Sequence, residues 1–152
     1  MFPTVDGRNL NGVAFRLPRD FKAPASIVFV AFKREQQRDV DSWKTFVRDV
    51  RAKRPDIGEY EVPVLSKGDA LIRFLIDGGM RRGIPDLAVR AATITLYIDK
   101  GPFDASLGLA SESDIAVLLV EPDGTILWRA AGAYVEGKGD GLDAVLATLG
   151  RS

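Results

Sequence analysis

Apolar residues occur along the chain as short continuous runs and as helical stripes, a pattern that predicts alternating strands and helices. Residues 26–32 form a β-branched apolar run, typical of a strand buried on both faces of a sheet. The polar residues 33–38 follow, and then an apolar stripe with helical spacing. Its members are Val40, Trp43, Phe46, Val47 and Val50. This stripe predicts an amphipathic helix with Asp39 as its N-cap, ended by Pro55.

The rest of the chain continues this alternation. Further strands are predicted over residues 13–17, 59–66, 93–99 and 115–121, and from residue 126 onwards, where a Pro-Asp-Gly turn signal precedes the last one. Further helices are predicted from Asp69 to Gly78 and over residues 85–92, 104–110 and 142–149. This order predicts an α/β fold, a mixed sheet flanked by helices with a C-terminal β-hairpin and helix. We expect one domain over residues 1–152, with residues 1–24 as a strand-and-turn extension.

The 152 residues include no cysteine and no histidine, which removes most familiar catalytic chemistry. Without cysteine the chain has no disulfide, no thiolate nucleophile and no thiolate metal site. Without histidine it has no imidazole base and no serine–histidine triad. Carboxylates occur throughout the chain, but none follow the spacing of a calcium loop. We therefore expect no metal and no other cofactor.

Charge and hydropathy narrow the choice of partner and compartment. The 21 Lys and Arg residues balance 21 Asp and Glu residues, so nucleic-acid binding is not expected. The longest apolar stretch, residues 115–120, is far shorter than the roughly 20 residues of a membrane helix, so we expect a soluble protein. Residues 1–8 show no signal peptide. A cytoplasmic location is the default expectation, and export after removal of a leader is the alternative.

The order of elements resembles the thioredoxin-like superfamily over residues 13–149. Leu17-Pro18, followed by the buried run, resembles the entry to a peroxiredoxin-type domain. Residues 116–126, Ala-Val-Leu-Leu-Val-Glu-Pro-Asp-Gly-Thr-Ile, resemble the late hairpin of the superfamily. The resemblance implies a thioredoxin fold whose functional edge lies where the first central strand ends.

The chain departs from its enzymatic relatives at that edge. Thioredoxin-like enzymes carry their reactive cysteines directly after the first central strand, where this chain has residues 33–38, Lys-Arg-Glu-Gln-Gln-Arg. They usually place a cis-proline before the third central strand, where this chain has residues 111–114, Ser-Glu-Ser-Asp. Thiol–disulfide and peroxide chemistry are therefore excluded.

Among relatives without cysteine, the chain resembles the thioredoxin-like assembly factors of the mitochondrial ATP synthase. The resemblance rests on residues 126–132, Ile-Leu-Trp-Arg-Ala-Ala-Gly, and on the position of the helix that holds Trp43. Small periplasmic thioredoxin-like proteins have a similar outline. The resemblance implies a non-redox, non-catalytic binding or assembly-assisting module with a protein partner.

Basic residues mark the first candidate site. Lys33, Arg34 and Arg38 lie where the superfamily has its active-site loop and helix start, and Arg81 and Arg82 form a second basic loop between glycines. A helix N-terminus favours anions, so the first group is a candidate anion-binding or acidic-partner site. This makes a small-anion binder or enzyme the alternative function. The other interpretation is a solvated surface whose charges are offset by neighbouring carboxylates.

Two carboxylates and two aromatic residues complete the candidates. Glu112 and Asp114 lie two apart before a buried strand, and such a pair can divide acid and base roles. They equally fit solvated loop residues. If the fold is thioredoxin-like, they share one sheet edge with the basic residues.

Trp128 and Tyr134 follow the hairpin turn on an expected edge strand, where they are candidates for a partner interface or for the core. Trp43, Phe46 and Phe74 are expected in the core.

The absence of cysteine gives the first testable prediction. Pure protein is expected to show neither disulfide reductase nor peroxidase activity, because no thiolate is present to attack a disulfide or a peroxide. Both activities can be measured beside a cysteine-containing thioredoxin-like enzyme as the positive control. Turnover in the pure protein would overturn the exclusion.

Overall fold

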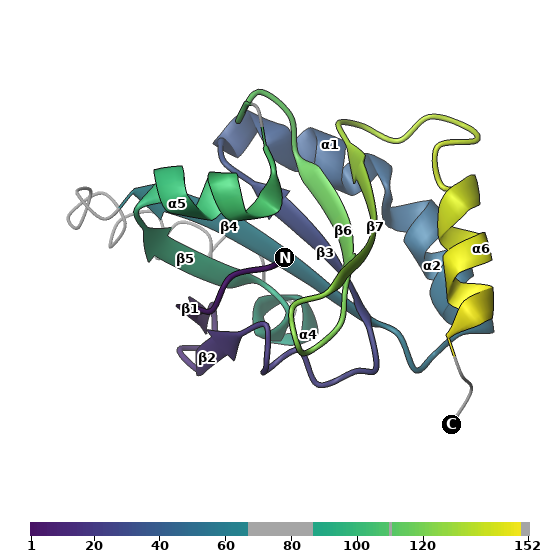
Figure 1. The fold of residues 1–152 in the computed structure, drawn as a ribbon, viewed down its shortest axis with the longest axis horizontal. Coiled ribbons are helices and arrows are strands. Elements are labelled where there is room, and N and C mark those ends of the chain that lie inside the picture. The colour runs from purple at the N-terminus through teal and green to yellow at the C-terminus, as the bar shows by residue number, and fades with distance from the viewer. Residues whose placement is uncertain (67–86, 110, 150–152) are drawn as a thin grey trace.

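A seven-stranded mixed sheet runs through the molecule, in the strand order β2-β1-β5-β4-β3-β6-β7 (Figure 1). The structure is a computed structural model that describes residues 1–66, 87–109 and 111–149. The strands are β1 (Val5–Asn9), β2 (Ala14–Leu17), β3 (Ser26–Ala31), β4 (Gly58–Ser66), β5 (Ile94–Ile98), β6 (Ala116–Val120) and β7 (Ile126–Ala131). The predicted fold class, a mixed α/β sheet flanked by helices, is confirmed.

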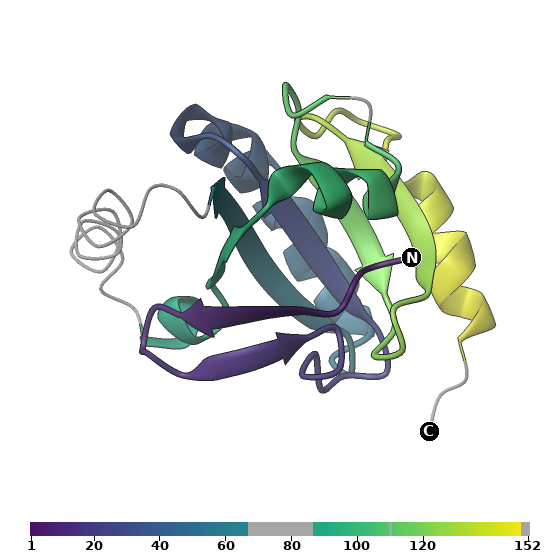
Figure 2. The same ribbon diagram turned by 60° about the vertical axis from the view of Figure 1, so that its left-hand side comes forward.

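β3 lies inside the sheet, between β4 and β6. It pairs with β4 in parallel from Ser26 opposite Gly58, and with β6 in antiparallel from Val30 opposite Ala116. The carboxyl end of β3 therefore lies beside the amino end of β6. An antiparallel hairpin closes the sheet on each side, β1–β2 at one edge and β6–β7 at the other (Figure 2).

Side chains of β3 alternate between two hydrophobic cores, as the continuous apolar run predicts. Val28 and Val30 enter the core that also contains Phe21 and the helical residue Phe103. Ile27 and Phe29 enter the core on the opposite face, with the apolar residues of the other helices. All four β3 side chains are almost completely buried. The strand is therefore held by hydrogen bonds along both edges and by packing on both faces.

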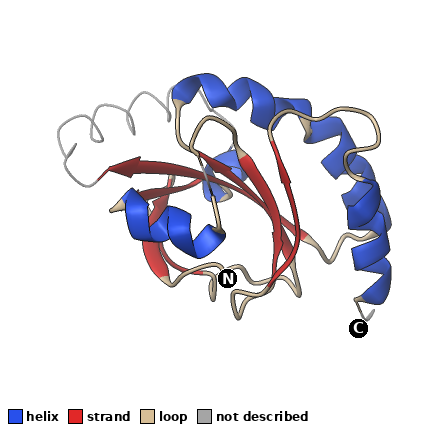
Figure 3. Cartoon of the chain, turned by 45° about the horizontal axis from the view of Figure 1, so that its top comes forward, coloured by secondary structure: helices blue, strands red, loops and turns tan. Residues whose placement is uncertain are grey.

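The helical segments lie on both sides of the sheet (Figure 3). They are the short 3-10 turn η1 (Arg34–Gln36), α1 (Gln37–Ser42), α2 (Lys44–Lys53), α4 (Leu87–Ala91), α5 (Lys100–Leu107) and α6 (Asp140–Thr148). Residues of α1, α2 and α6 contribute to the second core, whereas α5 contributes to the first. In the part of the chain that the structure describes, no helix has the length and apolar character needed to cross a membrane.

The first predicted helix is present, but its start was predicted wrongly. Helical structure begins at Arg34, and Asp39 lies in the first turn of α1 instead of capping it. The helix is also divided at Trp43, between α1 and α2. The predicted apolar stripe nevertheless faces the core, since Val40, Trp43, Val47 and Val50 are buried and Phe46 is half-buried.

Other boundaries differ modestly from the predictions. The short helix α4 lies within the predicted range 85–92, α5 begins four residues before the predicted 104, and α6 begins two residues before 142. Strand β1 was missed, because Val5-Asp6-Gly7-Arg8-Asn9 contains one apolar side chain and pairs through its backbone. The helix predicted from Asp69 to Gly78, together with Phe74 and the basic loop after it, lies outside the described residues.

Trp43 is the centre of an aromatic cluster in the second core. Its ring is fully buried and makes edge-on contacts with Phe46, Trp128 and Tyr134, at centroid distances of 5.8, 6.1 and 5.1 Å. Its indole Nε1–H donates to the carbonyl oxygen of Gly132 over 3.0 Å. Trp43 thus joins the junction of α1 and α2 to the segment that follows β7.

Truncation of Trp43 tests this role. We expect Trp43→Ala to lower the free energy of unfolding by about 3–5 kcal/mol, because it leaves a cavity and an unpaired carbonyl group. Val135→Ala, at a position 63% exposed, serves as the control and should change stability by less than about 0.5 kcal/mol. Urea unfolding followed by circular dichroism measures both, and equal stability of the two variants would contradict the assignment.

Candidate functional site

Gln36 joins the two loops that meet at the carboxyl end of β3. Its side-chain Oε1 accepts hydrogen bonds from the backbone N–H of Phe32 over 2.7 Å and of Lys33 over 3.2 Å. Its Nε2 donates to the backbone carbonyl of Glu112 over 2.8 Å. The residue is only 4% exposed. We call this arrangement, residues 32–36 bound to residues 111–114 through Gln36, the Gln36 junction.

A small ionic cluster lies beside the Gln36 junction. The Nζ of Lys100, the first residue of α5, is 3.4 Å from Oε1 of Glu112. The pKa of Glu112 is lowered, first by its hydrogen bond with the Asp104 carboxyl and then by the positive charges of Lys100 and Lys33, while partial burial acts in the opposite direction. Charges from α5 and from the loop after β3 therefore meet at one carboxylate.

Asp104 is the unusual member of this cluster. It lies one helical turn after Lys100 on α5, and its Oδ1 is buried, with no hydrogen-bond donor for it among the described residues. Burial raises the pKa of Asp104 to about 7, and the adjacent Glu112 carboxylate contributes to the rise, whereas Lys100 opposes it. Two carboxyl groups within hydrogen-bonding reach are stable together when one of them carries a proton. The directions of the two pKa shifts, raised for Asp104 and lowered for Glu112, assign this proton to Asp104.

Two of the predicted basic residues, Lys33 and Arg34, belong to the Gln36 junction, and Arg38 lies two residues after Gln36. Lys33, Arg34 and Arg38 are exposed, and among the described residues none of them forms an ion pair. The expected meeting of these residues with the 111–114 loop at one edge of the sheet is therefore found, through the Gln36–Glu112 hydrogen bond. Arg81 and Arg82 lie outside the described residues.

The anion-binding interpretation stays a prediction. The N–H groups of Phe32 and Lys33 are bound to Gln36, but they precede the helical structure, which begins at Arg34. The helical structure that follows is a short 3-10 turn and a six-residue helix. Any anion held here would depend on the exposed side chains of the basic residues.

The carboxylate pair differs from the one considered in the sequence. Glu112 is half-buried and its carboxyl partner is Asp104, whereas Asp114 is exposed. Lys100, Asp104 and Gln36 were missed as site residues. Gln36 lies inside the polar stretch already singled out, but a glutamine gives no sequence signal that it will be buried. Lys100 lay outside the predicted helix, so its one-turn spacing from Asp104 could not be recognised.

Trp128 and Tyr134 lie in the aromatic cluster around Trp43 instead of on an open surface. Both are half-buried, and the Tyr134 ring also stacks on Phe46 at 5.2 Å. β7 itself is the last strand of the sheet, as expected. An interface on this side would therefore use the strand edge and the exposed Arg129 more directly than the two rings.

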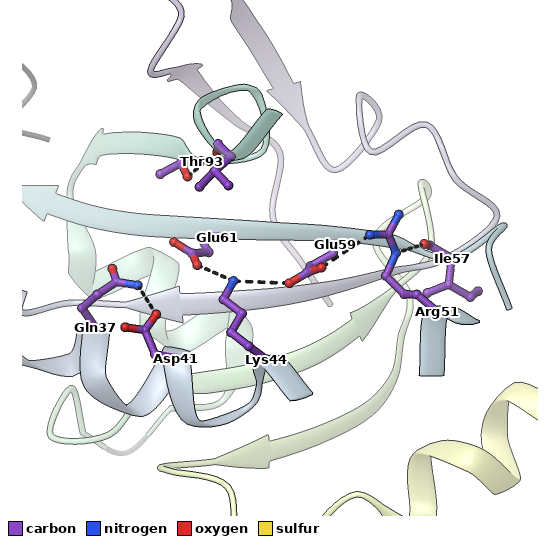
Figure 4. Close-up of polar contacts among 9 residues, drawn as sticks. Gln37, Asp41, Lys44, Arg51, Ile57, Glu59, Glu61 and Thr93 are labelled. Atoms are coloured by element: carbon purple, nitrogen blue, oxygen red, sulfur yellow. Dashed lines mark hydrogen bonds and ion pairs between the residues drawn. The ribbon is translucent and has the colours of Figure 1, made fainter. Parts of the chain in front are cut away.

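A second polar cluster, on the opposite side of β4 from the first core, has a structural role (Figure 4). Nζ of Lys44 lies 2.6 Å from Oε1 of Glu61 and 3.3 Å from Oε2 of Glu59. Arg51 donates from Nε to the carbonyl of Ile57 over 2.9 Å. These contacts attach α2 to β4. In neither cluster, nor elsewhere in the described ranges, do three His, Cys, Asp or Glu side chains gather closely enough to hold a metal ion.

Comparison with known proteins identifies the fold. No protein-family model and no curated protein matches the chain. Among solved structures, it is similar to a putative electron transfer protein from Aquifex aeolicus, with a TM-score of 0.66 and 11% identity over 99% of this chain and 97% of the other. It is similar to the exposed lipoprotein thioredoxin Etrx1 of Streptococcus pneumoniae, with a TM-score of 0.57 and 12% identity over 95% and 99% of the two chains.

A third similar structure belongs to a family of assembly proteins. BsSco, a member of the Sco family of cytochrome c oxidase assembly proteins, matches with a TM-score of 0.57 and 15% identity over 96% of this chain and 91% of the other. At these identities the similarity shows the fold, and the chain has the thioredoxin-like fold predicted from its sequence.

Replacement of Gln36 tests the junction. We expect Gln36→Met, which keeps the length of the side chain, to lower the free energy of unfolding by about 2–4 kcal/mol, because two backbone N–H groups and one carbonyl lose their partner. Gln37→Met is the matched control: Gln37 is exposed, and its bond to Asp41 should contribute about 0.5 kcal/mol or less. Urea unfolding compares the variants, and similar losses at both positions would contradict the junction.

The raised pKa of Asp104 predicts how stability depends on pH. Between about pH 4 and pH 7 the folded state keeps a proton on Asp104 that the unfolded state has lost, so the free energy of unfolding should fall as pH rises through this window. Asp104→Asn should remove this fall. Asp49→Asn, at an exposed position on α2, should retain it. Urea unfolding at pH 5, 6, 7 and 8 measures the slopes, and equal slopes in the two variants would refute the assignment.

Proposed function

We propose that this protein is a non-redox thioredoxin-like module that recognises a protein partner through the surface around the Gln36 junction. The observation that carries the proposal is the junction itself. Its two loops correspond to those that carry the cysteines and the cis-proline in thioredoxin-like enzymes, and here a glutamine joins them by three hydrogen bonds. A surface fixed in this way suits recognition, because little loop entropy is lost when a partner binds.

The charges near the junction support a partner with acidic character. Arg34 and Arg38 are exposed and lack carboxylate partners among the described residues. Arginine is favoured at protein interfaces, since its planar guanidinium group binds carboxylates with two hydrogen bonds. A partner that supplies those carboxylates would complete the surface.

An assembly role is the more specific form of this proposal. The similarity to BsSco, a member of a family of cytochrome c oxidase assembly proteins, supports it at the level of the fold. The sequence resemblance to the ATP synthase assembly factors points in the same direction, through residues 126–132 and the helix that holds Trp43. For this chain the proposed role is binding, which requires no cysteine.

A small-anion binder or enzyme is the second candidate, favoured by the exposed side chains of Arg34 and Arg38, which form no ion pair within the described ranges. It is the weaker candidate because the helical structure that begins at Arg34 is a 3-10 turn and a six-residue helix, whose N-terminus carries little partial positive charge. In addition, a groove of about 730 Å³ lies at the N-terminal hairpin and on β5, and its lining contains no residue of the junction.

Charge reversal distinguishes a specific partner surface from general attraction. The double variant Arg34→Glu/Arg38→Glu should retain a partner from the native lysate at least about tenfold less than the wild-type protein, because attraction becomes repulsion at the interface. The control Arg48→Glu/Lys53→Glu makes the same change of net charge at exposed positions on α2 and should retain the partner normally. Quantitative mass spectrometry measures retention, and equal loss in both variants would contradict the proposed surface.

The second candidate makes a different prediction. Phosphate or a small dicarboxylate should then raise the melting temperature in a saturable manner, since a ligand that binds the folded state stabilises it. Arg34→Ala/Arg38→Ala should abolish the rise. A thermal-shift series at constant ionic strength tests this, and a rise that persists in the double variant would exclude the basic residues as the site.

A further inference from the structure

The Asp104–Glu112 pair connects α5 to the loop of the Gln36 junction. Asp104 comes from α5, and Glu112 comes from the loop whose backbone Gln36 holds. Side chains of α5 that serve the core, such as Phe103 and Leu107, point into the first core instead. The pair is thus attached directly to the surface proposed for partner binding.

The charged groups that act on the pair come from two elements. Lys100 faces it from α5, with Nζ at 3.4 Å from Glu112, and Lys33 acts on Glu112 from the loop after β3. With one proton on the pair, these four side chains carry a net charge of +1, from two lysines and one carboxylate. When the proton is lost, the second carboxylate brings the net charge to zero.

Loss of the proton also changes the forces within the pair. A protonated carboxyl group of Asp104 can donate a hydrogen bond to Glu112, whereas two carboxylates repel each other. In the part of the chain that the structure describes, no N–H or O–H group donates to the buried Oδ1 of Asp104. The backbone of Glu112 is held by Gln36, so the repulsion acts on a loop that belongs to the junction.

We propose that Asp104 and Glu112 share one proton and act as a pH-dependent control of partner binding, with tighter binding of an acidic partner when the proton is present. The control of binding rests on the function proposed above, whereas the shared proton is a property of the protein alone. In the protonated state, an acidic segment meets a site whose net charge is more positive by one unit. It also meets a 111–114 loop that is not displaced by repulsion between two carboxylates.

The first experiment tests the shared proton without any partner. Carbon-13 NMR of the side-chain carboxyl groups, recorded on the whole protein from pH 3 to pH 9, should show one group of the pair titrating near neutral pH in the wild type. Asp104→Asn should leave Glu112 titrating at acidic pH only. Glu112→Gln is the second variant, in which the titration of Asp104 should move to lower pH, so that failure of one variant to fold does not prevent the test. Titration of both wild-type groups below pH 5 would overturn the proposal.

The second experiment tests the control of binding with a defined probe, a peptide of eight glutamates labelled with tetramethylrhodamine, whose charge does not change between pH 6 and pH 8. Because one unit charge at roughly 8–10 Å in water changes the interaction by about 0.5 kcal/mol, binding at low salt should be about twofold tighter at pH 6 than at pH 8. Asp104→Asn should remove this difference and Asp49→Asn should retain it. Fluorescence anisotropy measures the affinities.

The outcomes separate the two proposals. Equal affinity at pH 6 and pH 8 in the wild type, beside a confirmed neutral titration, would overturn the control of binding. A pH dependence that persists in Asp104→Asn would also overturn it. If the peptide binds at neither pH and the lysate yields no partner sensitive to Arg34 and Arg38, the proposed function fails, even where the NMR titration confirms the shared proton.

Discussion

Burial of β3 on both faces is the constraint on which the functional edge depends. Its side chains alternate between two cores, and its backbone is paired on one edge with β4 and on the other with β6. If the strand slid by one residue or rotated, each side chain would move to the opposite core, where it does not fit the existing packing. The strand is therefore held in one register. The position of Phe32 and Lys33, directly after the strand, is therefore fixed by packing several residues away.

Gln36 connects this fixed position to the loop before β6, so that both loops are held in place. In a thioredoxin-like fold the residues after the first central strand face the loop before the third, and side-chain chemistry decides how the two loops interact. Here the amide group of Gln36 accepts on one side and donates on the other, so both loops become parts of one hydrogen-bonded unit. The same bonds occupy the backbone N–H groups of Phe32 and Lys33, which makes the surface more ordered.

The sequence predicts those parts of the structure that depend on local pattern. The apolar run of β3, the stripe of α1 and α2, and the hairpin of β6 and β7 follow directly from periodicity and turn residues. β1 could not be predicted in this way, because its pairing with β2 and β5 uses backbone groups that every residue possesses.

The sequence located the two loops of the Gln36 junction but not the contacts within it. The superfamily resemblance pointed to this edge of the sheet, and the structure brings the loop of Lys33 and the loop of Glu112 together there. The partner of Glu112 depends on tertiary structure, because Asp104 reaches it only when α5 packs on the sheet. Trp128 and Tyr134 illustrate the same limit, since an aromatic residue on an edge strand can face a neighbouring helix as readily as a partner.

In the proposed control of binding, the loss of one proton acts on a small group of charges. Two lysines and two carboxyl groups lie together beside the junction, and ionisation of Asp104 takes the net charge of these four side chains from +1 to zero. The burial of one Asp104 oxygen moves that ionisation from the acidic range to neutral pH, where most proteins have no carboxyl group left to titrate. A chain with neither histidine nor cysteine can therefore still respond to pH near neutrality, through a carboxyl pair on a surface that its core holds in place.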